Sequence, residues 1–339
     1  MHYGHGDDSY RYSRTMVANH STNIWPLGPS KALKEHLCQE ISSIGSYPEC
    51  FSESLIEKLS KKHQLTSEHI GAFNGIAEAI YLIAQHYREK RSAIVYPAFS
   101  EYEDATIQFG HHNSYISEKE FSSTDLGNYD LCWICNPNNP TGKIYTKAEL
   151  IEKVKAFPQT LFIIDEAYME LIAEDQSLVS ECSNHHNLIV MQSLTKNFAI
   201  PGLRLGVVYS SPETIASLHS IRPPWSVNSM ALTAGNYLLD HPPYDQILLE
   251  QYLENSRKLQ TALSNISNIE VEESETGFFL FRTPIKSEEL KEKLVNEYGI
   301  LVRDASNFRG LSPYHIRIAA LGEEKDRHIV EALKNIFES

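Results

Sequence analysis

The stretch "SLTKNFAIPGLRLG", Ser193–Gly206, places two hydroxyl side chains, a lysine and an arginine directly after an apolar run. The preceding residues, "NLIVMQ" (187–192), are hydrophobic without interruption, as expected for a strand covered on both faces of a parallel sheet. A solvent-exposed loop would explain the charges of Lys196 and Arg204 but not the hydrophobic residues on either side. This segment therefore predicts a functional site at the end of a buried strand.

Other apolar runs share this uninterrupted pattern: "SAIVYP" (92–97), "LCWIC" (131–135), "TLFIID" (160–165) and "LRLGVVY" (203–209). Helical segments separate several of them. In "NGIAEAIYLIAQHYREK", one buried helix face is marked by apolar residues at spacings of three and four, Ile76, Ala79, Ile80 and Ile83. Strands that alternate with helices predict an α/β fold in which helices flank a mostly parallel central sheet.

The pattern changes after about residue 240, where "QILLEQYLENSRKLQTALSNI" reads as a long amphipathic helix. Shorter strands and two more helical segments follow, which predicts a smaller α+β domain. We therefore expect an N-terminal arm that contributes to the small domain (1–45), a large α/β domain (46–240) and a small C-terminal domain (241–339). A chain of 339 residues is long enough for about two domains.

Composition excludes several classes of partner. The chain has 30 lysines and arginines against 44 aspartates and glutamates, a net charge of −14, which disfavours binding to nucleic acid or to anionic membranes. No apolar run approaches the roughly 18 residues of a membrane helix, and no signal peptide is recognisable, so we expect a cytoplasmic protein. Cys132 and Cys135 lie three residues apart on a predicted strand and point to opposite faces, and no HExxH motif occurs, so no metal site is expected.

Polar residues follow the predicted strands in "YPAFSEY", "CNPNNPTG", "DEAY" and "SLTK". In open parallel sheets, ligands bind at this carboxyl edge. Asp165 ends a buried strand and needs a cationic or hydrogen-bonding partner, unless it caps a helix. "NPNNPT" is compatible with a simple turn, but Asn138 or Asn139 could also face the same cleft. Gly75 marks a helix start, where free N–H groups bind phosphate well.

Together these features describe one ligand. A helix N-terminus could hold a phosphate with the help of three side chains, those of Ser193, Thr195 and Arg204. Phe99 could stack on an aromatic ring, Asp165 could pair with a protonated ring nitrogen, and Lys196 could form a Schiff base with an aldehyde. A phosphate, a pyridinium nitrogen and an aldehyde on one ring define pyridoxal 5′-phosphate (PLP).

"NPNNPTG", "DEAY" and "SLTKNFAIPGLRLG" stand in the order and approximate spacing of the fold-type I PLP enzymes, the aspartate-aminotransferase superfamily, which the chain resembles over nearly its whole length. The resemblance implies that Lys196 binds the cofactor covalently and then acts as acid and base, and that Asp165 keeps the ring nitrogen protonated. Tyr168 joins them as a catalytic residue. Further implied cofactor contacts are Gly75, Ile76, Ala77, Phe99, Asn139, Ser193, Thr195 and Arg204, with Tyr47 reaching the cofactor of the partner in a homodimer.

Within the superfamily, "STNIWPLGPS", "RPPWSVNSMA" and "HGDD" resemble the threonine-phosphate decarboxylases of cobalamin biosynthesis, whereas "YPEC" and "DEAYME" resemble the histidinol-phosphate aminotransferases. The resemblance implies a small phosphorylated amino acid or amine as substrate. Its implied ligands are Arg317, Arg303, Asn139, Asn23 and His5. We expect a PLP-dependent decarboxylase, with an aminotransferase as the alternative and a catalytically silent PLP-binding protein as a remote one.

Overall fold

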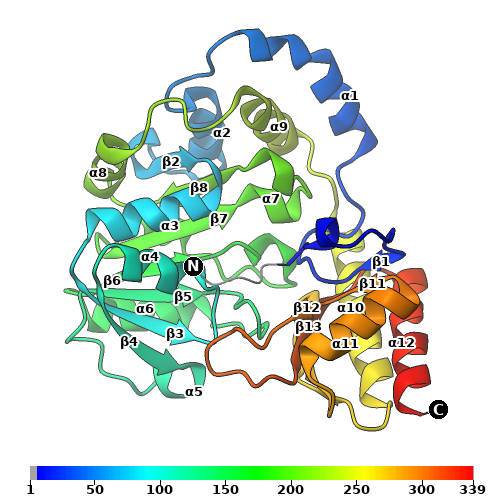
Figure 1. Ribbon diagram of the computed structural model, residues 1–339. Helices are drawn as coiled ribbons and strands as arrows, with labels where there is room; N and C mark the ends of the chain where they lie inside the picture. Colours follow the sequence, from blue (N-terminus) through cyan, green and yellow to red (C-terminus); the bar gives the residue numbers. More distant parts are fainter. Residues whose placement is uncertain (1–5, 339) are drawn as a thin grey trace.

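A computed structural model describes residues 6–338, and its centre is a seven-stranded sheet in the order β2-β8-β7-β6-β5-β3-β4 (Figure 1). The strands are β2 (Ile70–Phe73), β3 (Arg91–Tyr96), β4 (His112–Ser117), β5 (Leu131–Cys135), β6 (Leu161–Asp165), β7 (Leu188–Ser193) and β8 (Gly206–Tyr209). β8 pairs antiparallel with both β2 and β7, and the other neighbours pair in parallel. The predicted mostly parallel α/β fold is confirmed.

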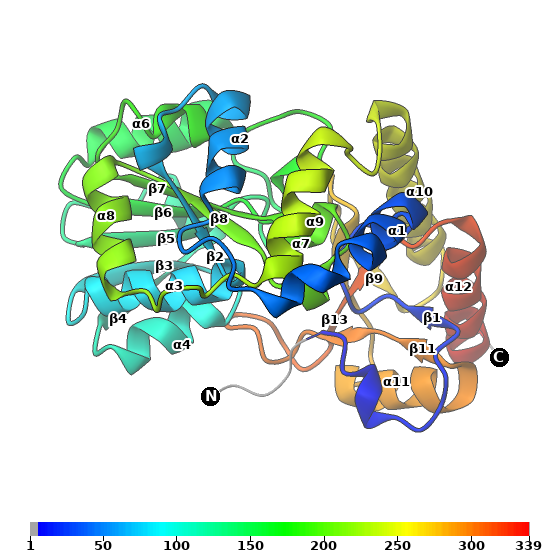
Figure 2. The ribbon, with the colours of Figure 1, turned by 90° about the horizontal axis from the view of Figure 1, so that it is seen from above.

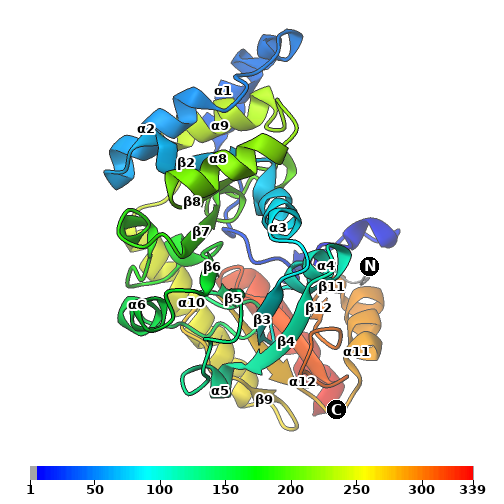
Figure 3. The ribbon, with the colours of Figure 1, turned by 90° about the vertical axis from the view of Figure 1, so that its left-hand side faces the viewer.

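Helices cover both faces of this sheet (Figure 3). One apolar core contains residues of α2 (Glu53–His63), α6 (Lys147–Ala156) and α9 (Ser229–Asp240). A second contains residues of α3 (Gly75–His86), α4 (Glu101–Gln108) and α8 (Pro212–Ile221). Cys132 belongs to the first core and Cys135 to the second, as their spacing predicted. The predicted apolar face of α3 is buried throughout.

A smaller antiparallel sheet, β12-β13-β10-β9, lies beside the large one and packs against three helices (Figure 2). Its strands are β9 (Glu270–Val271), β10 (Phe278–Arg282), β12 (Arg303–Asp304) and β13 (His315–Ala319), and the helices are α10 (Gln246–Ser264), α11 (Ser287–Lys293) and α12 (Glu323–Phe337). Near the N-terminus, β1 (Ala18–Asn19) pairs in parallel with β11 (Ile300–Leu301). The domain boundaries placed at residues 45 and 240 remain predictions.

Several elements lie where the sequence indicated none, such as α2, α4, α8 and α9. Two others bury little apolar surface. β4 is the edge strand of the large sheet, and only Ile116 among its residues is buried, so it lacks the continuous apolar pattern of the central strands. α1 (Lys31–Gln39) buries only Leu33, which explains why no periodicity marks it. The run "GILVRD" divides at Val302 into β11 and β12, which belong to different sheets.

Within residues 6–338, no helix combines the length and the hydrophobicity that a membrane crossing requires.

The quoted segment 193–206 begins and ends at paired residues, because Ser193 of β7 lies opposite Gly206 of β8. A Cβ atom on Gly206 would lie 2.5 Å from the backbone nitrogen of Ile76 and 2.8 Å from the carbonyl carbon of Gly75. The start of β8 therefore touches the first turn of α3 directly, which only a glycine permits. A Cβ on Gly75 would in turn lie 2.7 Å from Nη2 of Arg204.

We predict that Gly206→Ala lowers the free energy of unfolding by about 1–3 kcal/mol, because the added methyl group must displace the backbone of α3. Urea denaturation of purified protein measures this loss. Gly202→Ala is the matched control, since a Cβ there meets no heavy atom within 4 Å. Equal unfolding midpoints for the two variants would show that the close approach of β8 to α3 is not a constraint.

Candidate active site

One cavity opens at the carboxyl ends of β5, β6 and β7. Its lining residues are Ile76, Ala77, Phe99, Cys135, Asn139, Asp165, Ala167, Tyr168, Ser193, Thr195, Lys196 and Arg204. All of them except Cys135 and Ala167 were predicted from the sequence. The segments that follow three neighbouring strands meet here because parallel strands end at the same edge of the sheet.

Lys196 lies on α7 (Leu194–Asn197), the single helical turn that follows β7. The pKa of its amine is lowered to about 8, first by burial and then by the nearby positive charges of Arg317 and Arg204, against the opposing effect of Asp165. A substantial fraction of the amine is therefore neutral near physiological pH. A neutral lysine amine is the nucleophile that attacks an aldehyde.

Asp165 ends β6 and is 2% exposed. The pKa of its carboxyl group is raised to about 6, because the effect of burial exceeds that of three neighbours that lower it. The Tyr102 hydroxyl donates to Oδ2 at 2.5 Å, the backbone N–H of Ala167 donates to Oδ1 at 3.0 Å, and Lys196 contributes positive charge. The next helical turn begins only at Met169, so the helix-cap interpretation of Asp165 is wrong.

The N-terminus of α3 and the segment after β7 form a cradle for an anion. Asn74, at the start of α3, makes no side-chain capping bond, so the first N–H groups of the helix have no side-chain acceptor from it. Ser193 and Thr195 place their hydroxyl oxygens 2.8 Å apart at the same cavity. Arg204 has the left-handed backbone conformation, with φ 60°, beside Gly75. Three kinds of donor therefore converge where a phosphate would bind.

The asparagine-rich loop after β5 resolves the choice that the sequence left open. Asn138 points away from the cavity, because its Nδ2 donates to the carbonyl oxygen of Pro97 at 2.6 Å. Asn139 lines the cavity, and its Oδ1 accepts from Nη1 of Arg317 at 2.6 Å. Asn139 thus joins this cavity to the smaller sheet.

Arg303 and Arg317 lie opposite each other on the neighbouring strands β12 and β13. Their exposed fractions are 7% and 5%. Arg317 also donates from Nη2 to the carbonyl oxygen of Ser21, but its Nε has no partner and no carboxylate of residues 6–338 pairs with it. Arg303 donates to the side chain of Asn307. Burial lowers the pKa of each guanidinium to about 10, and the charge of Arg317 contributes to the shift of Arg303.

The remaining predicted residues differ in their placement. Asn23 is buried beside Tyr168, and neither its amide nitrogen nor its oxygen has a hydrogen-bond partner in good geometry. Tyr47 is 84% exposed and packs against Trp225 on the surface, away from the cavity of its own chain. His5 lies outside the described residues.

Sequence reasoning missed three residues of the site, of which Ala167 lies within the selected motif "DEAY". Cys135 lines the cavity and directly precedes the asparagine-rich loop, where its position at the end of a strand was the available signal. Tyr102 contacts Asp165 from α4, and no local signal pointed to it, because its partner is 63 residues away in the sequence.

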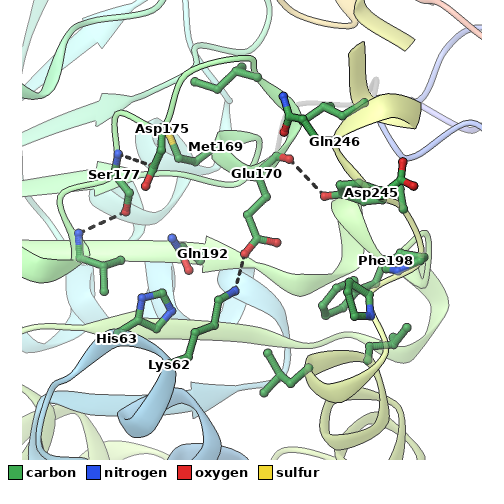
Figure 4. Close-up of a pocket in the computed structure, with 18 of the residues that line it drawn as sticks. Lys62, His63, Met169, Glu170, Asp175, Ser177, Gln192, Phe198, Asp245 and Gln246 are labelled. Carbon is green, nitrogen blue, oxygen red and sulfur yellow. Dashed lines mark hydrogen bonds and ion pairs between the residues drawn. The ribbon is translucent and has the colours of Figure 1, made fainter. Parts of the chain in front are cut away.

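A larger cavity, of about 570 Å³, is lined by Gln192 and Phe198, which flank α7 in the sequence, and Lys196 is not among its lining residues (Figure 4). Glu170 is its central charged group: it accepts from Lys62 at 2.8 Å and from the side chain of Asn197. Consecutive residues of α7 therefore face different spaces, Lys196 toward Asp165 and Asn197 toward Glu170. The chemistry predicted from the sequence belongs to the first space.

The residues of the smaller cavity fit PLP. The cradle suits the phosphate, the Asp165 carboxylate suits a protonated ring nitrogen, and the Lys196 amine suits the aldehyde. Within residues 6–338 no group of three or more histidine, cysteine or acidic side chains is arranged to hold a metal ion.

Comparisons with known proteins agree with this geometry. The chain matches the family described as aminotransferase class I and II over residues 16–333. It is 30% identical over 344 residues to the adenosylcobalamin biosynthesis bifunctional protein CobDQ of Leptospira interrogans, an alignment that covers 95% of this chain but only 39% of that protein.

Two solved structures are also similar over nearly their full length. L-threonine-O-3-phosphate decarboxylase from Porphyromonas gingivalis superimposes with a TM-score of 0.92 at 32% identity, covering 95% of this chain and 100% of that one. Histidinol-phosphate aminotransferase from Clostridium acetobutylicum superimposes with a TM-score of 0.86 at 28% identity, covering 94% and 98%.

We predict that apoprotein captures PLP covalently faster as the pH rises through about 8, the pKa of Lys196. Below that pH the amine is protonated, and the neutral fraction falls about tenfold for each further pH unit. Stopped-flow absorbance measures the rate between pH 6 and 9, and borohydride reduction followed by mass spectrometry locates the bond. Lys196→Ala is the control that binds the cofactor without a covalent link. A rate independent of pH would contradict the role of this lysine.

Proposed function

Because this chain belongs to the family of class I and II aminotransferases, whose enzymes depend on PLP, we propose that it removes the carboxylate of a small phosphorylated amino acid. The activity would be that of an L-threonine-O-3-phosphate decarboxylase, with a histidinol-phosphate aminotransferase as the second candidate. The solved decarboxylase is more similar to this chain than the solved aminotransferase, both in identity and in TM-score.

The observation that carries the proposal is the buried pair of Arg303 and Arg317. Like charges directly opposite on neighbouring strands repel each other, and a buried charge without a counter-charge is costly. Arg317 has no carboxylate partner among residues 6–338. A ligand that carries two anionic groups, such as the carboxylate and phosphate of a phosphorylated amino acid, supplies the missing negative charge. The unpartnered amide of Asn23 offers further hydrogen bonds to the same ligand.

The N-terminal segment is compatible with a phosphate nearby, although it contains two aspartates. Asp8 accepts from Nζ of Lys291 through both carboxylate oxygens, at 2.9 and 2.7 Å. Asp7 accepts from the side chain of Asn19 at 2.8 Å. Each carboxylate is thus engaged by the smaller domain or by the arm itself, and the pairing with Lys291 fixes the arm on α11.

When bound, the cofactor would withdraw electrons from the Cα atom of the substrate. Asp165 would hold the proton on the ring nitrogen, which makes that withdrawal effective. Asn139 and Tyr168 would bind the phenolic oxygen of the ring, and Phe99 would cover one ring face. Lys196 would move protons at Cα, because its buried amine lines the cavity in which the substrate would meet the cofactor.

The orientation of the substrate carboxylate separates the two candidate reactions. If Arg317 presents the carboxylate for loss as CO₂, Lys196 would supply the proton that replaces it at Cα. If Arg317 holds the carboxylate so that it is retained, Lys196 would remove the Cα proton instead. Arg317 is the group that sets this orientation, and its own position is fixed by Asn139 and by the backbone of Ser21.

A homodimer is part of the proposal. Three exposed apolar side chains, those of Ile44, Tyr47 and Trp225, surround a hollow of about 490 Å³, and their exposed fractions are 64%, 84% and 47%. An apolar patch of this kind on a monomer marks an association surface. A second copy of the chain is the proposed occupant, with Tyr47 completing the cofactor site of its partner.

The substrate experiment supplies O-phospho-L-threonine to holoenzyme without any keto acid. We expect release of CO₂ together with an aminopropanol phosphate. Trapping of the gas measures the first product, and phosphorus NMR measures the second. Lys196→Ala should yield neither product. The aminotransferase assignment would be correct if the enzyme does not decarboxylate phosphothreonine but converts histidinol phosphate, and does so only when 2-oxoglutarate is supplied.

The homodimer is tested by mixing two impaired variants, Lys196→Ala and Tyr47→Ala, under conditions that exchange subunits. Activity should exceed that of either variant alone, because one site of the mixed dimer receives Lys196 from one chain and Tyr47 from the other. The control mixes Lys196→Ala with Asp165→Ala, which lie on the same chain in every site and should not complement. A monomer by light scattering, or no gain on mixing, would refute the shared site.

A further inference from the structure

Tyr102 lies on the first turn of α4, with 1% of its side chain exposed. Its hydroxyl donates to Oδ2 of Asp165 at 2.5 Å, across 63 residues of sequence. Burial raises the pKa of the phenol far above its usual value, and the carboxylate of Asp165 raises it further. Tyr102 therefore remains a neutral hydrogen-bond donor over the whole physiological range of pH.

The aromatic surroundings fix the direction of this hydroxyl. The Tyr102 ring stacks on Trp133 of β5, with centroids 5.8 Å apart and planes at 22°. Trp133 in turn donates from Nε1 to the hydroxyl of Ser92 at 3.4 Å, and Ser92 bonds to His111 at 2.8 Å. The Tyr102 ring has few ways to move, so its hydroxyl is held on one oxygen of Asp165.

The two oxygens of Asp165 are occupied differently. Oδ2 accepts from Tyr102 and Oδ1 accepts from the backbone N–H of Ala167. An ionised carboxylate offers about four lone-pair sites, so each oxygen keeps one for a further donor. A protonated ring nitrogen would be the third donor to this carboxylate. The more donors a carboxylate accepts, the more strongly its ionised form is favoured.

The segment just before α4 also contributes Phe99, the residue proposed to cover one face of the PLP ring. Phe99 lies three residues before Tyr102, and the two rings meet edge to face with centroids 5.9 Å apart and planes at 83°. Phe99 lines the cavity itself, whereas Tyr102 does not. Tyr102 therefore acts through Asp165 and not on the ligand.

We propose that Tyr102 is a positioning residue that holds the Asp165 carboxylate ionised and correctly oriented for the ring nitrogen of PLP. Without this donor, burial would favour the protonated form of Asp165, which cannot form a charge pair with the nitrogen. The inference depends on the proposed role of Asp165 and is independent of whether the enzyme decarboxylates or transaminates.

Tyr102→Phe tests the inference, because it keeps the stacked ring and removes only the hydroxyl. We expect the dissociation constant of PLP, measured by equilibrium dialysis, to rise roughly tenfold, as expected for loss of a hydrogen bond to a charged group. The nitrogen NMR signal of ring-labelled PLP should shift from the protonated toward the neutral form. kcat should fall more than KM rises, since the ring then withdraws electrons less well.

Tyr145→Phe is the matched control. Its hydroxyl is also buried but has no hydrogen-bond partner, and it does not line the cofactor cavity. We expect wild-type cofactor affinity and an unchanged nitrogen signal in this variant. Incorporation of 3-fluorotyrosine at position 102 provides a second measurement that retains the hydroxyl and makes it a stronger donor. It should leave the nitrogen fully protonated.

A double-mutant cycle identifies the route of the effect. If Tyr102 acts through Asp165, then Tyr102→Phe should weaken PLP binding in the native background but hardly at all in the Asp165→Asn background. An equal loss in both backgrounds, or a nitrogen signal unchanged by Tyr102→Phe, would overturn the inference. Wild-type affinity in Asp165→Asn alone would instead refute the proposed role of Asp165.

Discussion

The buried carboxylate of Asp165 is the interaction around which the site is organised. A carboxylate removed from water is costly unless donors and positive charges surround it. This chain provides them from three separate segments: Tyr102 from α4, the backbone of Ala167 after β6, and Lys196 from α7. Each segment must be held in place for the charge to be tolerated. The same arrangement leaves one lone-pair site on each oxygen for a further donor, such as a protonated ring nitrogen.

The strand order explains how residues far apart in sequence reach this carboxylate. β6 lies between β5 and β7, so the segments that follow these three parallel strands are neighbours at one edge of the sheet. β8 then runs antiparallel to β7, and it therefore begins at the edge where β7 ends. Because Ser193 pairs with Gly206, the segment between them stays at that edge throughout. Lys196 and Arg204 are thereby kept at the same cavity, where the first is proposed to meet the aldehyde of PLP and the second its phosphate.

Local sequence pattern was sufficient for the central strands, for α3 and α10, and for most residues of the cavity beside Lys196, because continuous apolar runs and the residues that end them are encoded locally. It failed for β4 and α1, which bury too little to show a pattern. It also selected Arg303 and Arg317 one at a time but not as a pair, since their contact depends on the register of β12 and β13. Tyr102 was missed for a similar reason: its partner is 63 residues away, and nothing near it in sequence indicates a carboxylate.

The site is divided between the two sheets, and this division affects the choice between decarboxylation and transamination. The large sheet and its helices contribute the groups proposed to hold the cofactor, whereas the small sheet contributes the arginines proposed to hold the substrate. Asn139 joins the two sets, because it lines the cofactor cavity and accepts from Arg317. A shift of β13 would move Arg317, and with it the proposed position of the substrate carboxylate, and it would also change the positive charge that acts on Lys196. The proposed choice between decarboxylation and transamination therefore depends on how the smaller sheet places Arg317 against the large one.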